Sequence, residues 1–118
     1  MEKIVRQALL YDFYGELLTE HQKSVYSDIV LNDLSYSEVA RDEGISRQGV
    51  YDLVKRCDKI LEEYESKLLL VEKFLETKER VSKIHELATD LKTMTENPQL
   101  QEKINAIEEI SKAIYESY

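Results

Sequence analysis

The chain has 118 residues, which is enough for about one domain with a modest core. Charged residues make up 34% of it, and it holds only three glycines, one proline and no tryptophan, so collagen-like and low-complexity classes are excluded. The net charge of −8 argues against a simple binder of duplex DNA, because affinity for phosphate usually comes with a basic domain.

The longest uninterrupted apolar run, residues 68–71, is far shorter than the roughly 20 residues that span a bilayer. The first residues also lack the apolar core of a signal peptide. We therefore expect a cytoplasmic protein without membrane insertion. The lone Cys57 cannot form an intramolecular disulfide, and its place in a helix favours a small buried side chain over a nucleophile.

Two helices are predicted first along the chain, and a third follows. The first ends near Leu18, and its apolar face is formed by Ile4, Val5, Ala8, Leu9, Tyr11, Phe13 and Leu17. Thr19 caps the second, whose buried stripe consists of Val25, Tyr26, Ile29 and Val30. Asn32 and Asp33 end that helix, and Ser35 or Ser37 begins the third.

Residues 36–56 have the pattern of a helix, a sharp turn and a second helix. Ala40 is small where the two helices cross, and Gly44 stands where a left-handed backbone would cost other residues roughly 1–2 kcal/mol. Ser46 is a good N-cap for the second helix. The pattern predicts a helix-turn-helix whose junction is filled by Val39, Ile45, Val50 and Leu53.

The N-terminal half of the second helix would face a nucleic-acid groove, where arginine and glutamine suit base edges and more distal basic residues suit phosphates. The predicted contact residues are Ser46, Arg47, Gln48, Tyr51, Lys55 and Arg56. Two features argue against this use: Gly49 costs the helix about 1 kcal/mol, and Asp52 places a negative charge on the same face. The alternative is a three-helix core with a solvated polar face.

Neither half of the chain is basic. Eight Lys and Arg oppose thirteen Asp and Glu in residues 1–64, and eight oppose eleven in residues 65–118. Only residues 46–59 lean positive, with Arg47, Lys55, Arg56 and Lys59 against Asp52 and Asp58. Binding to DNA or structured RNA is therefore expected to be local, modest or assisted by oligomerisation.

A long helical arm is predicted beyond Arg56, because no glycine follows and no proline occurs before Pro98. A bend is expected at Ser66 or in residues 68–71, since a segment that is apolar on every side must be buried on every side. Asn97 and Pro98 break the arm, and the stripe of a last, antiparallel helix is Leu100, Ile104, Ile107, Ile110 and Ile114. The predicted domains are a helix-turn-helix bundle at residues 1–65 and an amphipathic helical arm at residues 66–118.

Two amphipathic helices alone form a thin hairpin, so their apolar stripes need a further surface. Near-heptad positions flanked by Glu and Lys indicate helix packing between protomers, and these are Leu61, Tyr64, Leu68, Val71 and Leu75. A homodimer or higher homo-oligomer is therefore predicted. The alternative is that the arm packs on its own bundle.

No catalytic, metal or cofactor site is predicted. His85 and Glu86 begin a zinc-protease helix signature, but Thr89 occupies the position of the second histidine ligand. The sequence has no phosphate-binding glycine loop, no Cys or His pair at ligand spacing and no nucleophile elbow.

The segments Ser37-Glu38-Val39-Ala40 and Gly44-Ile45-Ser46-Arg47, with Val50, resemble the promoter-reading fourth region of bacterial sigma factors. Over nearly its full length the chain is similar to the YlxM family of small helix-turn-helix proteins from Gram-positive bacteria, most closely in residues 9–15, 44–52 and 61–65. This resemblance implies an all-α, sigma-like module with a helical extension and a regulatory role linked to the signal recognition particle pathway.

Two functions therefore remain open. The first is a nucleic-acid-binding regulator, in which the motif docks on DNA or structured RNA and the arm dimerises the protein. The second is a non-catalytic protein-interaction module, in which the acidic arm binds a basic partner such as a signal recognition particle protein. The first is favoured, because Arg47 and Gln48 are expected to be exposed where a nucleic-acid reader would have them.

Overall fold

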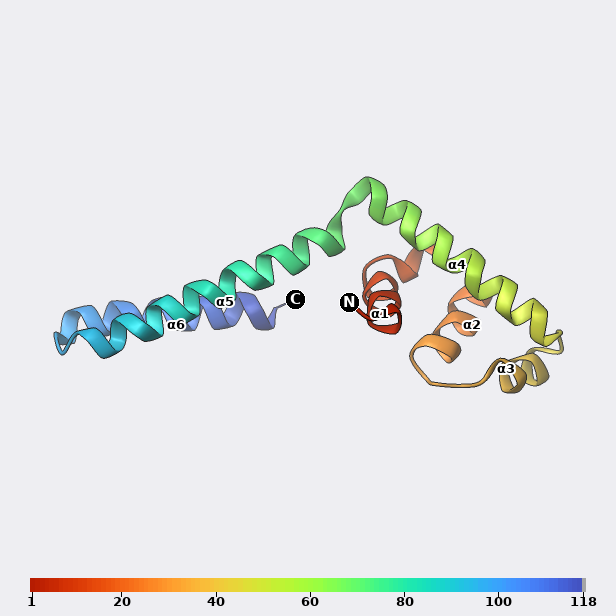
Figure 1. Ribbon diagram of the computed structural model, residues 1–118, viewed down its shortest axis with the longest axis horizontal. Coiled ribbons are helices and arrows are strands. Elements are labelled where there is room, and N and C mark those ends of the chain that lie inside the picture. The colour runs from red at the N-terminus through yellow and green to blue at the C-terminus, as the bar shows by residue number, and fades with distance from the viewer. Residues whose placement is uncertain (118) are drawn as a thin grey trace. The chain divides into compact units, whose positions relative to one another are not determined.

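The computed structural model describes residues 1–117, and these form helices without strands (Figure 1). The elements are α1 (Lys3–Tyr14), a short 3-10 helix η1 (Gly15–Leu17), α2 (Glu20–Val30), α3 (Tyr36–Glu43), α4 (Arg47–Leu68), α5 (Leu70–Met94) and α6 (Pro98–Glu116). The predicted all-α class is confirmed. The chain divides into two compact units, of which the first spans Met1–Val71 and the second begins at Glu72.

Capping side chains set the starts of α2 and α3. Thr19 and Ser35 each form a capping box, in which the hydroxyl accepts from the backbone N–H three residues later. The side chains there, Gln22 and Glu38, accept in turn from the backbone N–H of the cap. Ser35, and not Ser37, therefore begins α3.

The core of the first unit lies between α4 and the three shorter helices, which Figure 1 shows on one side of α4. Each helix contributes one apolar stripe, because residues three and four apart share a helical face. The most deeply buried side chains are Leu10 and Tyr14 of α1, Val25 and Tyr26 of α2, Val39 of α3, and Val50, Cys57 and Leu61 of α4.

A buried carboxylate holds the end of α4 against α1. Glu65 is only 5% exposed, and its Oε1 accepts hydrogen bonds from Tyr14 Oη at 2.6 Å and from the backbone N–H of Val71 at 3.0 Å. Tyr14 Oη in turn accepts from the backbone N–H of Leu70 at 3.1 Å. Two of the free N–H groups at the start of α5 are thereby satisfied by side chains of α1 and α4.

The predicted bend is confirmed as a break at Leu69, whose φ of 55° is left-handed. This conformation costs a residue with a side chain roughly 1–2 kcal/mol, so the hydrogen bonds around Glu65 must offset it. The expected burial of the surrounding apolar cluster is wrong. Leu68, Leu69 and Leu70 are 40–48% exposed, and only Val71 enters the core.

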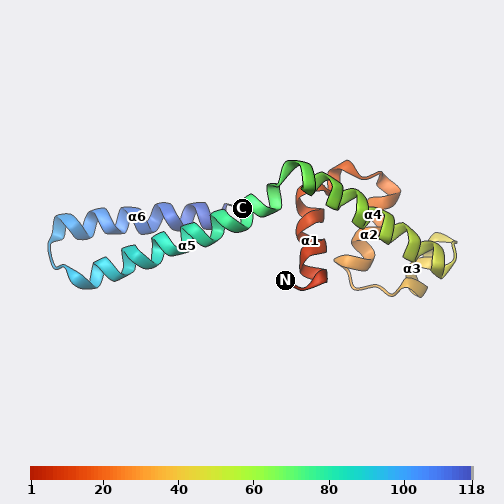
Figure 2. The same cartoon turned by 45° about the horizontal axis from the view of Figure 1, so that its top comes forward.

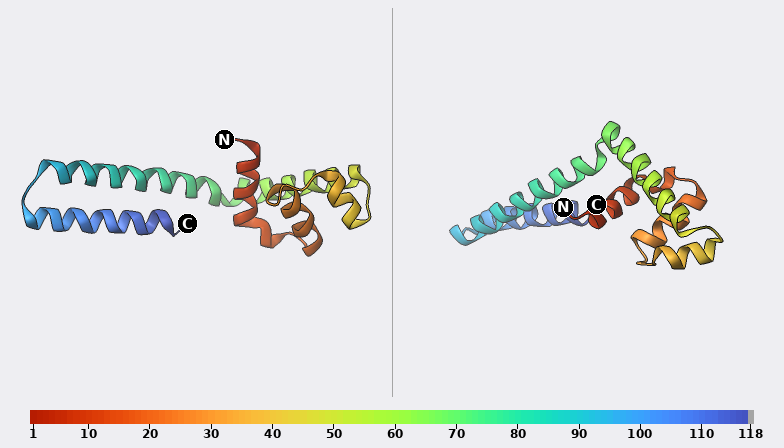
Figure 3. Two further views of the ribbon diagram at one scale, coloured as in Figure 1. Left: turned by 90° about the horizontal axis from the view of Figure 1, so that it is seen from below. Right: turned by 45° about the vertical axis from the view of Figure 1, so that its right-hand side comes forward.

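The second unit is an antiparallel hairpin in which α5 and α6 lie side by side (Figures 2 and 3). Asn97 caps α6, since its Oδ1 accepts from the backbone N–H groups of Gln99 and Leu100 at 2.9 and 3.2 Å. Lys92 Nζ donates to Glu108 Oε1 across the hairpin at 3.2 Å. Within the described chain, no helix is sufficiently long and apolar to traverse a membrane.

The first prediction concerns Tyr14. In Tyr14→Phe, the Leu70 N–H and the Glu65 carboxylate lose a partner at a buried site, and we expect a loss of about 1–3 kcal/mol of unfolding free energy. Urea titration followed by far-ultraviolet circular dichroism measures it. Tyr51→Phe, at an exposed tyrosine of the same unit, is the matched control and should change stability by less than about 0.5 kcal/mol. Equal stabilities of the two variants would contradict the role given to Tyr14.

The second prediction concerns alkaline pH. Burial raises the pKa of Tyr14 and Tyr26, and it raises the pKa of the Cys57 thiol to about 11. Groups with a raised pKa in the folded state add stability below their unfolded pKa, and this stability is lost as pH rises through the folded value. The thermal midpoint should therefore begin to fall near pH 9.0, the ordinary cysteine value, and fall more steeply above the ordinary tyrosine value of 10.0.

Thermal scans across that range, for the parent chain and Cys57→Ala, measure this effect. The variant should lack the part of the decline that begins near pH 9.0. A midpoint that stays constant up to pH 11 would refute the prediction.

Candidate nucleic-acid interface

The turn between α3 and α4 has the geometry of a helix-turn-helix. Gly44 adopts a left-handed conformation with φ 68° and ψ 30°, and its N–H donates to the carbonyl of Ala40. The N–H of Ile45 donates to the same carbonyl at 3.1 Å, which is the hydrogen bond of a Schellman ending. Ser46 Oγ then accepts from the N–H of Gly49 at 2.9 Å and begins α4. The roles predicted for Gly44 and Ser46 in this turn are confirmed.

The junction between α3 and α4 differs in part from the prediction. Val39 and Val50 are buried there as expected, but Ile45 is 38% exposed and Leu53 only half-buried. The stripe of α4 that enters the core runs through Val50, Val54, Cys57 and Leu61, at spacings of three and four residues. This stripe passes to one side of Leu53, and the turn leaves Ile45 at the surface.

Gly49 has a packing reason for its place in the first turn of α4. A Cβ added there would lie 3.1 Å from Ser46 Oγ, and it would also contact Ile45. The neighbouring side chains would have to shift by a few tenths of an ångström. Glycine lowers the helix propensity at this position, but it leaves the N-cap undisturbed.

All six residues predicted to contact nucleic acid are exposed: Ser46, Arg47, Gln48, Tyr51, Lys55 and Arg56. Two of them belong to an aromatic cluster. The Tyr51 ring meets the Tyr36 ring edge-on at 5.9 Å, and Lys55 Nζ lies 5.4 Å from the centre of the Tyr51 ring. Tyr36, the first residue of α3, thus adjoins this surface, although it is not among the six predicted contact residues. No local signal reveals it, since only the fold brings the two rings together.

The two aspartates near this surface differ in their exposure. Asp58 is half-buried and faces the core, where its Oδ1 accepts from Tyr26 Oη at 2.6 Å and from Gln7 Nε2 at 2.9 Å. Asp52 is exposed, and its Oδ1 accepts from Gln48 Nε2 at 2.9 Å. Along residues 46–59 of α4 and its cap, the four exposed basic side chains therefore have one exposed carboxylate among them.

The positions predicted to form a seam between protomers have different environments. Leu61 and Val71 are fully buried in the first unit, Tyr64 and Leu75 are half-buried, and Leu68 is 48% exposed. The Tyr64 ring stacks on the Tyr14 ring at 6.0 Å. Leu61 and Val71 thus serve the core of their own chain, and these five positions do not form a continuous exposed seam.

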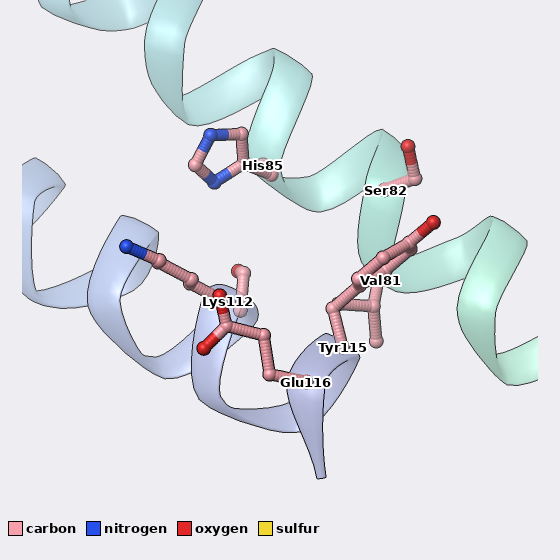
Figure 4. Close-up of a pocket in the computed structure, with 7 residues that line it drawn as sticks. Val81, Ser82, His85, Lys112, Tyr115 and Glu116 are labelled. Carbon is pink, nitrogen blue, oxygen red and sulfur yellow. The ribbon is translucent and has the colours of Figure 1, made fainter. Parts of the chain in front are cut away.

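The second unit has an open groove of about 440 Å³, lined by Val81, Ser82, His85, Ser111, Lys112, Tyr115 and Glu116 (Figure 4). It contains His85 of the zinc-protease-like segment. Thr89 of that segment directs its Oγ1 to Glu108 Oε2 at 3.4 Å. Among residues 1–117, no group of three or more His, Cys, Asp or Glu side chains is placed to hold a metal ion.

The fold and the turn define a helix-turn-helix protein with a helical extension. A family model described as "Putative helix-turn-helix protein, YlxM / p13 like" (UPF0122) matches residues 1–107, so the chain belongs to this family. Among curated relatives, the UPF0122 protein YlxM of Bacillus subtilis (strain 168) is 44% identical over 110 residues, covering 93% of this chain and 97% of the relative. A UPF0122 protein of Bacillus thuringiensis (strain Al Hakam) is 41% identical over 110 residues, covering 93% and 98%.

The resemblance to the YlxM family is thus confirmed. The helix-turn-helix is the feature by which this family is described.

Proposed function

We propose that the protein is a regulator that binds DNA or structured RNA through the N-terminal half of α4. The supporting observation is the start of α4, where a helix-turn-helix exposes Arg47, Gln48, Tyr51, Lys55 and Arg56 together on one helix. In docked modules of this kind, the second helix lies in the major groove with its first turns toward the bases.

Each exposed side chain has a role that its chemistry suits. Arg47 and Gln48 would contact base edges, where arginine pairs with guanine and glutamine with adenine. Lys55 and Arg56 lie two turns further along α4 and would contact phosphates. Tyr51 would contact a sugar or an unpaired base, since its ring is exposed beside Lys55 and Tyr36.

The charge of the whole chain limits the expected affinity. The first unit is acidic overall, so the attraction to phosphate comes from the four basic residues of residues 46–59 alone. About three phosphate contacts per module would give a modest, salt-sensitive complex, since the affinity falls with salt in proportion to the phosphates neutralised. Sequence preference would then come from Arg47 and Gln48.

Two more specific proposals about the cellular role rest on the family resemblance and on the composition. One is that the regulation belongs to the signal recognition particle pathway. The other, the second candidate function, is that the protein is an interaction module whose second unit binds a basic protein of that particle. The excess of eleven Asp and Glu over eight Lys and Arg in residues 65–118 favours this second candidate, because an acidic helical surface attracts basic partners more readily than nucleic acid.

The third prediction tests the main proposal. Arg47→Ala/Gln48→Ala should lower affinity about 10- to 100-fold for a DNA duplex or an RNA hairpin that the parent chain has selected from a random-sequence pool, measured by fluorescence anisotropy at about 50 mM salt. Lys55→Ala/Arg56→Ala should reduce the steepness of the salt dependence by about two phosphate contacts. Lys67→Ala/Gln99→Ala removes the same charge and amide outside the interface and is the matched control.

The two candidate functions predict different outcomes. If neither probe binds the parent chain at low salt, while a basic protein partner is captured equally by the parent and by Arg47→Ala/Gln48→Ala, the interaction module replaces the regulator. Loss of nucleic-acid binding in this variant alone supports the regulator.

The fourth prediction concerns Asp52. Asp52→Asn removes the one exposed carboxylate along residues 46–59 but keeps an oxygen that accepts from Gln48, so affinity for duplex DNA should rise about three- to tenfold at low salt. Asp12→Asn, at an exposed aspartate of α1, is the control and should have little effect. Equal affinities of the parent and Asp52→Asn would show that phosphate does not approach this face.

A further inference from the structure

The second unit leaves most of its apolar side chains exposed. Within residues 72–117, only Val81 and Ala88 of α5 and Ile104 and Ser111 of α6 are buried. Eight large apolar side chains are 40–77% exposed, and we call them the apolar face: Ile84, Leu87, Leu91, Met94, Leu100, Ile107, Ile110 and Ile114. A hairpin with twice as many exposed as buried positions is poorly stabilised by its own packing.

These side chains lie on one side of the hairpin. On α5, Ile84 and Leu91 each follow a buried residue by three positions, and at about 100° per residue they lie to one side of the buried stripe. Ile107 and Ile114 stand in the same relation to Ile104 and Ser111 on α6. Because the helices are antiparallel, equal offsets place both exposed stripes on the same side of the pair.

The groove confirms this geometry from the opposite side. Ser82 and His85 of α5 and Lys112 and Glu116 of α6 follow the buried residues by one to five positions, and all four line one groove (Figure 4). The hairpin therefore has a polar side, where the groove lies, and an apolar side. The groove contains none of the eight side chains of the apolar face.

The size of the apolar face fits a protein partner. The exposed fractions of its eight side chains correspond to roughly 900 Å², whereas the largest apolar patch of a monomer is about 300–600 Å² and each partner of a standard interface contributes about 800 Å².

We propose that this apolar face packs against the same face of a second copy of the chain in a four-helix arrangement, because one such face against its copy supplies the area of a standard interface. This inference does not rest on the proposed nucleic-acid function. It places self-association on α5 and α6 instead of on the near-heptad positions around Leu68, which the first unit partly uses for its own core.

The fifth prediction is that the full-length protein is a dimer at micromolar concentration by size-exclusion chromatography with light scattering. Leu87→Glu/Ile110→Glu should raise the dimer dissociation constant at least about 100-fold, because it would bury charge at the centre of the interface. Ser82→Glu/Asn105→Glu adds the same charge on the polar side and should leave the dimer intact. Circular dichroism checks that both variants remain helical. A monomeric parent protein, or equal dissociation of both variants, would overturn the proposal.

Discussion

The buried carboxylate of Glu65 is the contact on which the first unit depends. It receives the hydroxyl of Tyr14 and the first turn of α5, and it thereby joins α1, α4 and the start of α5 at one point. A buried carboxylate is stable only with such donors, because desolvation otherwise outweighs any gain. The same contacts compensate for the left-handed backbone of Leu69. The end of α4 is therefore determined by side chains that are remote in sequence.

A second polar contact determines which face of α4 remains exposed. Asp58 joins Gln7 of α1 and Tyr26 of α2, so this part of α4 cannot rotate without leaving its carboxylate unpaired in the core. The two carboxylates fix α4 along its length. Gln48 and Lys55 are exposed as a consequence, since they occupy the side of the helix opposite to the packed stripe, whereas Arg47 is exposed because it is the first residue of α4. Core and interface are two faces of one helix.

The two units bury their apolar side chains to different extents. The first covers α4 with three helices and encloses a continuous core, whereas the second has only two helices and encloses four residues within 72–117. Two helices can bury one narrow stripe each, and α5 and α6 carry apolar residues well beyond that stripe. A hairpin cannot bury these additional apolar side chains. In the proposed dimer the second copy covers them, and the polar side with the groove remains exposed to solvent.

The sequence by itself determined the helices, their caps, the glycine turn and the set of exposed residues on α4, because these follow from neighbours within a few positions. It also carried the family resemblance. Only the tertiary structure decided that Asp58 faces inward while Asp52 stays outside, that Tyr36 meets Tyr51, and that Leu61 and Val71 belong to the core of their own chain. In the sequence, Asp52 and Asp58 are both simply charged residues of a predicted helix. Their difference arises from tyrosine and glutamine side chains more than thirty residues away, which local patterns do not encode.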